Sequence, residues 1–250
     1  MTQTTHIRQG SVALVTGASS GIGEAVAVAL IARGCRVIGA ARRVDRLQAL
    51  AERLGEDFHP LALDVADPNS VNGLVDRLPA ELRDIAMLIN NAGHGSGGRV
   101  RFDDHGADEL ASIIETNVVG LIRLTRLVAP IMVAQDRGDI VNVGSIMGVR
   151  PYGSSAAYTA SKHAVHGLSD CLRLDFAKTG LRVIEILPGL TRTEFANHLS
   201  HDGGSDPVKM YDERPSVLTA DDVARAVVFS LDQPPHVTIA QITVLPSHQG

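Results

Sequence analysis

Short uninterrupted apolar runs alternate along this chain with longer segments in which apolar residues recur every three or four positions. A short apolar run is typical of a strand buried on both faces, and the longer spacing is typical of an amphipathic helix. The runs predict strands at residues 12–16, 36–41, 58–63, 86–90, 139–144, 181–187 and 236–245. The spacing predicts helices at residues 24–33, 44–54, 68–78, 107–133, 157–178 and 219–231. This alternation predicts an α/β fold with a doubly wound, parallel, seven-stranded sheet and helices on both faces.

No linker, repeat or low-complexity tract divides these elements, so residues 1–250 are expected to form one domain. Residues 1–10 are polar and precede the first strand, and we expect them to be disordered or extended. Residues 94–104 form a glycine-rich loop, and residues 191–215 are polar and irregular. Because binding functions concentrate in such loops, residues 191–215 are the best candidate for a substrate lid.

Composition narrows the class of partner. The formal net charge of -5 argues against nucleic acid, because phosphate binding needs a basic face. No apolar run reaches the length of a membrane span and the N-terminus lacks a secretory signal, so no membrane association is expected. The two cysteines, Cys35 and Cys171, are interpreted as small buried hydrophobic residues. A reducing, cytoplasmic location is therefore expected.

Three glycines follow the first predicted strand and precede the first predicted helix, at positions 17, 21 and 23. A strand, a glycine-rich turn and a helix bring free backbone N–H groups and the positive end of a helix together, which suits a diphosphate. The spacing is a G-x-x-x-G-x-G variant of the common dinucleotide motif. The alternative is a tight turn without a ligand.

The second predicted strand ends at Ala41 without an acidic residue, and Arg42 and Arg43 follow it. In dinucleotide-binding folds an acid near this position binds the adenosine ribose, whereas arginine accommodates a 2′-phosphate. The pair therefore favours NADP over NAD. The competing interpretation places both arginines on a solvated face with Asp45 and Arg46.

Tyr158 and Lys162 lie four residues apart in the predicted helix 157–178, so their side chains project side by side. A neighbouring ammonium group favours the phenolate, and we expect the pKa of Tyr158 to be lowered. Such a tyrosine can act as a general acid and base near neutral pH. The alternative is an ordinary surface pair.

Together these motifs resemble the short-chain dehydrogenase/reductase superfamily from Val12 to about Pro246. The matching pieces are residues 16–23, Asp64-Val65, residues 90–93, Asn117, Ser145, Tyr158 with Lys162, and Pro188-Gly189 followed by Thr191 and Thr193. The stretches 40–43, 188–195 and 233–246 resemble, more narrowly, the NADP-dependent 3-hydroxy acid dehydrogenase branch, which acts on serine, allo-threonine and malonic semialdehyde.

The resemblance implies a Rossmann-type fold and a catalytic tetrad of Asn117, Ser145, Tyr158 and Lys162. Ser145 would hydrogen-bond the substrate oxygen, and Tyr158 would donate a proton to it or remove one. Lys162 would lower the pKa of Tyr158 and bind the nicotinamide ribose. Asn117 would hold a water molecule that links Lys162 to solvent.

The resemblance also implies the cofactor-binding residues. These are Gly17, Ser19, Ser20, Gly21, Ile22 and Gly23 around the pyrophosphate, Asp64 and Val65 at the adenine, Asn91, Ala92 and Gly93 at the ribose, and Pro188, Gly189, Thr191 and Thr193 at the carboxamide. Some NADP-using relatives carry a basic residue where this chain has Ser20. Recognition of the 2′-phosphate then depends on Arg42 and Arg43, and use of NAD stays possible.

Substrate contacts are predicted from position alone. The loop 95–101 contains little apolar material, which favours a small polar substrate. Arg150 and Arg192 fall near the predicted mouth and are candidates to bind a carboxylate, but the favoured interpretation is that both are exposed surface arginines. Phe195 is a further candidate for substrate contact. His163 and His166 share a helical face, but no further ligand lies at suitable spacing, and no metal site is expected.

The leading hypothesis is an NADP(H)-dependent oxidoreductase that interconverts a small polar alcohol and its ketone or aldehyde. The alternative within this class is a reductase of 3-oxoacyl thioesters or of general ketones. A protein of another class, a non-catalytic NADP sensor, should have lost the tyrosine or the lysine, and both stand here. The resemblance implies a homotetramer, or a dimer, in which the helices of Tyr158 and Asn117 contact other subunits.

Overall fold

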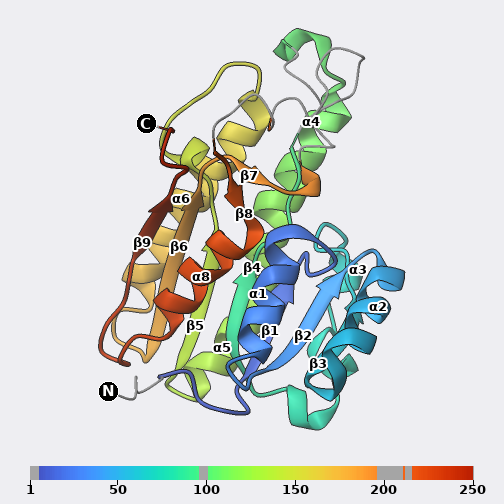
Figure 1. Ribbon diagram of the computed structural model, residues 1–250, viewed down its shortest axis with the longest axis vertical. Helices are drawn as coiled ribbons and strands as arrows, with labels where there is room; N and C mark the ends of the chain where they lie inside the picture. Colours follow the sequence, from blue (N-terminus) through green and yellow to red (C-terminus); the bar gives the residue numbers. More distant parts are fainter. Residues whose placement is uncertain (1–5, 96–100, 196–210, 212–215, 250) are drawn as a thin grey trace.

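The computed structural model describes residues 6–95, 101–195, 211 and 216–249. Its main sheet contains β1 (Val12–Thr16), β2 (Arg36–Ala41), β3 (Phe58–Ala62), β4 (Ile85–Asn90), β5 (Gly138–Val143), β6 (Leu181–Pro188) and β9 (Gln241–Val244). These seven strands are parallel and lie in the order β3-β2-β1-β4-β5-β6-β9 (Figure 1). The predicted parallel seven-stranded sheet is confirmed.

Helices cover both faces of this sheet (Figure 1). The helices are α1 (Gly21–Ile31), α2 (Val44–Leu54), α3 (Pro68–Val71), α4 (Ala107–Ile114), α5 (Leu121–Ala134), α6 (Ala156–Asp175) and α8 (Ala220–Leu231). Apolar residues of α1, α2 and α8 pack on one face, and those of α3, α5 and α6 pack on the other. Helix α8 begins as predicted, with a reciprocal capping box between Thr219 and Asp222.

The strand order places a crevice between β1 and β4. The chain runs outward from β1 through β2 to β3, then returns to the other side of β1 as β4. Ligands of open parallel sheets bind at such a point of reversal, beyond the carboxyl ends of the strands. Gly17 follows β1 and Asn91 follows β4, so the motifs found in the sequence meet there.

A predicted helix and a predicted strand differ from the structure in extent. The helix 68–78 is wrong as a single element, because α3 ends at Val71 and Gly73 adopts a φ of +70°, which breaks the helical path before a 3-10 turn at Val75–Arg77. The last strand is shorter than 236–245, because β6 pairs with it only from Glu185 to Pro188. Of residues 1–10, the structure describes only 6–10, where Ile7 is buried and its N–H donates to Asp232 Oδ1, so the disordered or extended N-terminus stays a prediction.

The predicted helix 107–133 is helical throughout but not uniform. A π-helical turn, Glu115–Gly120, separates α4 from α5 and contains Asn117. Gly120, the last residue of this turn, packs against Val65 in the loop after β3. An added Cβ atom on Gly120 would stand 2.7 Å from the Val65 carbonyl oxygen. Such turns inside helices often occur at functional positions.

The stretch Ala107–Ala134 is long and apolar enough, by length and composition, to cross a membrane, with a mean hydropathy of 1.5. This corrects the sequence interpretation, which found no run of that length. Leu124, Val128 and Met132 on this stretch are fully buried in the core beneath the sheet, as in a core helix of a globular protein. Cys35 is buried as predicted. Cys171 is exposed, so the prediction that it is buried is wrong.

A second, two-stranded sheet pairs β7 (Thr191–Arg192) with β8 (Leu218–Thr219) at the carboxyl end of the main sheet (Figure 1). The predicted lid, 191–215, begins at β7. Most of it lies outside the described residues, which include only 191–195 and Tyr211.

Candidate active site

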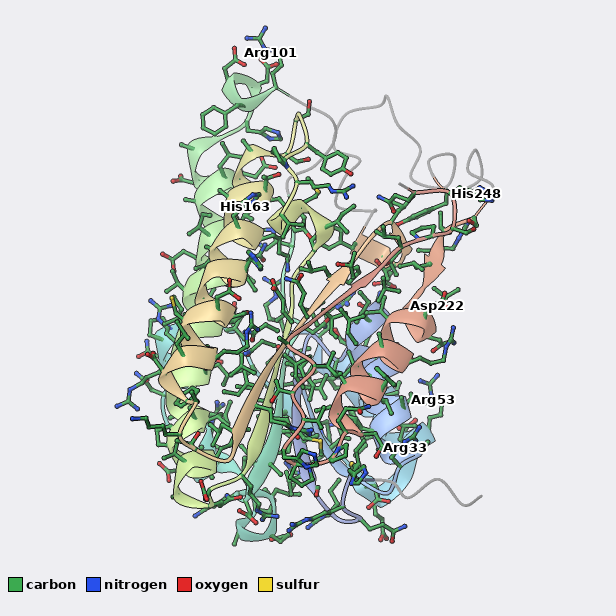
Figure 2. The ribbon with its side chains drawn as sticks, turned by 90° about the vertical axis from the view of Figure 1, so that its left-hand side faces the viewer. Arg33, Arg53, Arg101, His163, Asp222 and His248 are labelled. Atoms are coloured by element: carbon green, nitrogen blue, oxygen red, sulfur yellow. The ribbon has the colours of Figure 1, made fainter. Side chains whose placement is uncertain are left out.

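A large cleft of about 1660 Å³ opens along the carboxyl ends of the strands. Figure 2 shows Arg101 and His248 toward this end of the molecule and Arg33 toward the opposite end. The cleft is lined by most of the predicted site residues: Gly17, Ser19, Ser20, Gly21, Ile22, Arg42, Arg43, Asp64, Val65, Asn91, Ala92, Gly93, Ser145, Tyr158, Lys162, Pro188, Gly189, Thr191, Thr193 and Phe195. The fold therefore brings together residues that are far apart in sequence.

The glycine motif forms the turn from β1 into α1. Gly17 and Gly21 have φ values of +67° and +56°, which favour glycine. An added Cβ atom on Gly23 would stand 2.3 Å from the Gly17 carbonyl oxygen, so this glycine permits close packing within the turn and does not line the cleft. Helix α1 begins at Gly21, earlier than predicted, and its positive end borders the cleft.

Thr16 holds the two sides of the crevice together, a role that the sequence analysis did not assign. Its Oγ1 atom accepts hydrogen bonds from the N–H groups of Asn91 and Ala92, both at 3.0 Å, and donates to the Ile89 carbonyl. The Asn91 amide nitrogen donates back to the Thr16 carbonyl at 2.9 Å. These bonds position the loop after β4 against the glycine turn.

Arg43 lies at the end of the cleft beside the glycine turn. Its Nε atom donates to Ser19 Oγ at 3.1 Å and its Nη2 atom donates to Ser20 Oγ at 2.5 Å. Its Nη1 atom pairs with Glu194 at 2.9 Å. Arg42 also lines the cleft and is exposed. Glu194 was not predicted as a site residue, because its contact with Arg43 spans 151 residues and leaves no local signal in the sequence.

Ser145, Tyr158 and Lys162 meet at the other end of the cleft. Lys162 is buried, and its Nζ atom donates to the Val143 carbonyl at 2.8 Å, at the end of β5. The same nitrogen lies 5.6 Å from the centroid of the Tyr158 ring. The neighbouring phenol and ammonium groups predicted from their spacing are therefore present.

The pKa of Tyr158 does not follow the prediction. Burial raises the pKa of Tyr158 to about 12, although the hydrogen bond with Ser145 acts in the opposite direction. Burial likewise lowers the pKa of Lys162 to about 8, and the negative charge of Glu185 opposes this shift. The expected lowering of the phenol pKa by Lys162 is wrong for this arrangement, because desolvation of the phenol outweighs the hydrogen bond with Ser145 that lowers its pKa.

Asn117 lies behind the cleft and does not line it. Its Oδ1 atom accepts from the His94 N–H, and its Nδ2 atom donates to the His94 carbonyl, both at 2.9 Å. The same Nδ2 atom donates to Ser161 Oγ at 3.0 Å. Asn117 thus ties the loop after β4 to α6. Its predicted role in holding a water molecule remains a prediction.

The predicted substrate residues separate into two groups. Phe195 lines the cleft, and its ring centroid lies 5.4 Å from that of Tyr158. Arg150 and Arg192 are exposed and lie outside the cleft lining, and the Arg192 guanidinium stacks 4.9 Å over the Tyr211 ring. Tyr211 lines the cleft and was missed, because the surrounding residues show no periodic pattern.

The two histidines on α6 occupy different surroundings. His163 is exposed (Figure 2), and its Nδ1 atom bonds its own helix at the Thr159 carbonyl. His166 bonds the fully buried carboxylate of Glu185 at 2.7 Å, and Gln241 donates to that carboxylate at 3.1 Å. Across the described residues, no group of three or more histidine, cysteine or acidic side chains could hold a metal ion.

The fold and the cleft define a class of protein: a doubly wound parallel sheet with a glycine-rich turn at its point of reversal is the arrangement of dinucleotide-binding proteins. Residues 11–203 match the family model described as short chain dehydrogenase. The chain belongs to the short-chain dehydrogenase family.

Individual relatives match along nearly the whole chain. An NADP-dependent 3-hydroxy acid dehydrogenase of Schizosaccharomyces pombe is 38% identical over 247 residues, covering 96% of this chain and 94% of the relative. A serine 3-dehydrogenase of Agrobacterium fabrum is 34% identical, covering 95% of this chain and 94% of the relative. The solved closed form of a serine dehydrogenase complexed with NADP+ superposes with a TM-score of 0.87 at 35% identity, covering 96% of each chain.

Proposed function

We propose that this protein is an NADP(H)-dependent oxidoreductase that interconverts a small polar alcohol, such as a 3-hydroxy acid, and its ketone or aldehyde. One observation carries the proposal: a single cleft joins the glycine turn and Arg43 at one end to Ser145, Tyr158 and Lys162 at the other. The names of the relatives support the cofactor and the class of substrate.

The residues at the end of the cleft formed by the glycine turn and Arg43 fit a dinucleotide. The glycine turn leaves room for a pyrophosphate because no side chain projects from Gly17 or Gly21, and the positive end of α1 borders it. Asp64 and Val65 would contact the adenine, and Arg42 and Arg43 would contact the 2′-phosphate. Binding of NAD stays possible because Ser20 provides no positive charge.

The residues of the second half fit proton transfer. NADP supplies or accepts the hydride when bound. With a pKa of about 12, the Tyr158 hydroxyl keeps its proton at neutral pH and can donate it to a carbonyl oxygen. Ser145 holds that oxygen, and Lys162 contributes a nearby positive charge as the substrate gains an alkoxide character. In the reverse direction Tyr158 must first lose its proton, and the phenolate then accepts the proton of the alcohol.

The substrate is proposed to be small and polar, with Phe195 beside the reacting group. A carboxylate contact with Arg150 or Arg192 remains a prediction, and neither residue lines the cleft. The alternative substrates, 3-oxoacyl thioesters and general ketones, are outcomes of the activity test below.

The test is oxidation of NADPH and NADH by the purified protein with a panel of small carbonyl compounds, including malonic semialdehyde and acetoacetate. Tyr158→Phe should lower turnover by about 10²- to 10⁴-fold, because it removes the proton donor and keeps the ring that packs on Phe195. Tyr152→Phe removes the hydroxyl of another tyrosine that lines the cleft and is 44% exposed, and it should lower turnover far less than Tyr158→Phe. If the protein binds NADPH but turns over no carbonyl compound, the proposed oxidoreductase activity is contradicted and a non-catalytic cofactor sensor is favoured.

We further propose a homotetramer in the cytoplasm, with a dimer as the alternative. Large apolar side chains stand exposed on the outer helices: Ile122 and Val133 on α5, Leu174 on α6 and Phe229 on α8. An apolar side chain exposed on a helix face is a candidate for contact with another subunit.

A further inference from the structure

Three charged side chains meet at the arginine end of the cleft. Glu194 follows β7 and lines the cleft, and its carboxylate accepts from Arg43 Nη1 at 2.9 Å and from Arg46 Nη1 at 2.6 Å. Arg43 precedes α2 and Arg46 belongs to its first turns. One carboxylate, 151 residues from Arg43 in the sequence, therefore pairs with two guanidinium groups beside the glycine turn, and the three side chains keep one net positive charge.

Arg43 has no guanidinium nitrogen without an acceptor. Two nitrogens donate to Ser19 and Ser20, and the third donates to Glu194. Each of the two Nη atoms carries a second N–H, so an anion that approaches Arg43 either binds beside these acceptors or displaces one of them. Of the three acceptors, Glu194 alone carries a negative charge, and its bonds to Arg43 and then to Arg46 hold its pKa below the usual range.

The neighbours of Glu194 fix its position across the cleft. The Thr193 side chain stands over the glycine turn, where an added Cβ atom on Gly21 would lie 3.2 Å from it. The Phe195 ring packs on Tyr158 at a centroid distance of 5.4 Å. Residues 193–195 thus span from the glycine turn to the tyrosine, and Glu194 is held facing the arginines between them.

From this geometry we propose that Glu194 is a specificity-determining residue that occupies the position of a 2′-phosphate on Arg43 and is held there by Arg46. A nucleotide with a 2′-phosphate must either break these ion pairs or bind beside a carboxylate of like charge. A nucleotide with a free 2′-hydroxyl meets neither obstacle. Glu194 therefore weakens the binding of NADP(H). As a result, it reduces the protein's preference for NADP(H) over NAD(H). The inference depends on the proposed function, because it assigns the 2′-phosphate to this end of the cleft.

Glu194→Gln tests the proposal, since glutamine keeps the size and one oxygen acceptor but removes the charge. Dissociation constants for NADPH and NADH would be measured by nicotinamide fluorescence on the protein without substrate. We expect NADPH to bind about three- to tenfold more tightly and NADH to change less than twofold. Competition by 2′,5′-ADP should tighten in parallel, while competition by 5′-ADP should not. Raising the salt concentration should shrink the difference, because these side chains are exposed.

Asp84→Asn is the matched control. Asp84 pairs with Arg137 at 3.0 Å, is similarly exposed, and lies at the amino end of β4, away from the cleft. Asp84→Asn changes the net charge of the protein by the same amount as Glu194→Gln. It should leave the dissociation constants of NADPH and NADH unchanged. Glu194→Ala must shift the preference in the same direction as Glu194→Gln.

The proposal is overturned if NADPH binding is unchanged or weaker in Glu194→Gln, if both cofactors tighten equally, or if Asp84→Asn reproduces the effect. These outcomes would leave the proposed function standing. Failure of the wild-type protein to bind either cofactor would overturn the proposed function, and this inference with it.

Discussion

At the scale of single residues, burial decides the chemistry of the candidate active site. Tyr158 and Lys162 lie together as their spacing predicts. Desolvation raises the pKa of Tyr158 and lowers that of Lys162, so it favours the neutral form of both groups. The fully buried carboxylate of Glu185 lies behind this pair and favours the charged form of Lys162. A sequence identifies such groups, but only the surrounding atoms determine their protonation.

The depressed pKa of Lys162 predicts a pH-dependent stability. Its pKa is about 8 in the folded chain and 10.5 without burial, so between these values the unfolded chain binds a proton that the folded chain has lost. The free energy of unfolding therefore rises with pH over this range, by about 2 kcal/mol from pH 7 to 9.5 for this group. Urea denaturation followed by circular dichroism should show this rise in the wild type relative to Lys162→Met.

Lys178→Met provides the comparison, because Lys178 is exposed just beyond the end of the same helix. It should follow the pH dependence of the wild type. If Lys162→Met gains as much stability as the wild type between pH 7 and 9.5, then burial does not lower the pKa of Lys162.

At the scale of elements, the π-helical turn between α4 and α5 positions part of the site. The turn carries Asn117, whose side-chain amide accepts from the His94 N–H and donates to the His94 carbonyl. The same amide also donates to Ser161 on α6. Gly120 at the end of the turn lies against Val65 in the loop after β3. One irregular turn therefore contacts two of the loops that line the cleft.

Gly120→Ala should destabilise the protein by about 1–3 kcal/mol, because the new Cβ atom would stand 2.7 Å from the Val65 carbonyl oxygen. Gly167→Ala on α6 is the control, since an added Cβ atom there meets nothing within 4 Å. Removing this helical glycine should stabilise the protein by about 0.5–1 kcal/mol. Thermal denaturation of both variants measures the difference, and equal melting temperatures would contradict the close packing at Gly120.

At the scale of the whole molecule, segments near both ends of the chain are bonded to distant elements, and the C-terminal segment lines the cleft. Gln249 accepts a hydrogen bond from the Leu190 N–H at 2.8 Å beside the end of β6. Near the other terminus, the N–H groups of His6 and Ile7 donate to Asp232, just after α8. The cleft therefore depends on residues from Gly17 to Gln249, whereas the N-terminal contact ties the chain to the end of α8, away from the cleft.

The exposed apolar side chains of the outer helices predict assembly. Ile122 is 44% exposed on α5, and Leu174 is 78% exposed on α6. Replacing each by glutamate would place a charge in a subunit contact and should lower the mass measured by light scattering from that of a tetramer. Gln48→Glu on α2 adds the same charge at another exposed position and should keep the wild-type mass. A monomeric wild type would contradict the proposed assembly.

The sequence by itself determined the regular elements and the motifs. The bounds of β1, β2 and α2 agree with the prediction, because apolar periodicity and terminal glycines act within a few residues. The same holds for the glycine turn and for the pairing of Tyr158 with Lys162. Local spacing carries this information, and a parallel sheet then brings the carboxyl ends together.

The tertiary structure alone decided the features that depend on distant neighbours. Glu194 reaches Arg43 across 151 residues, and the pKa of Tyr158 follows from the protein that surrounds it. The break at Gly73 and the π-helical turn at Asn117 interrupt segments whose periodicity is continuous. Each depends on packing between elements, which local spacing does not encode, because burial and contact are set by atoms from the whole fold.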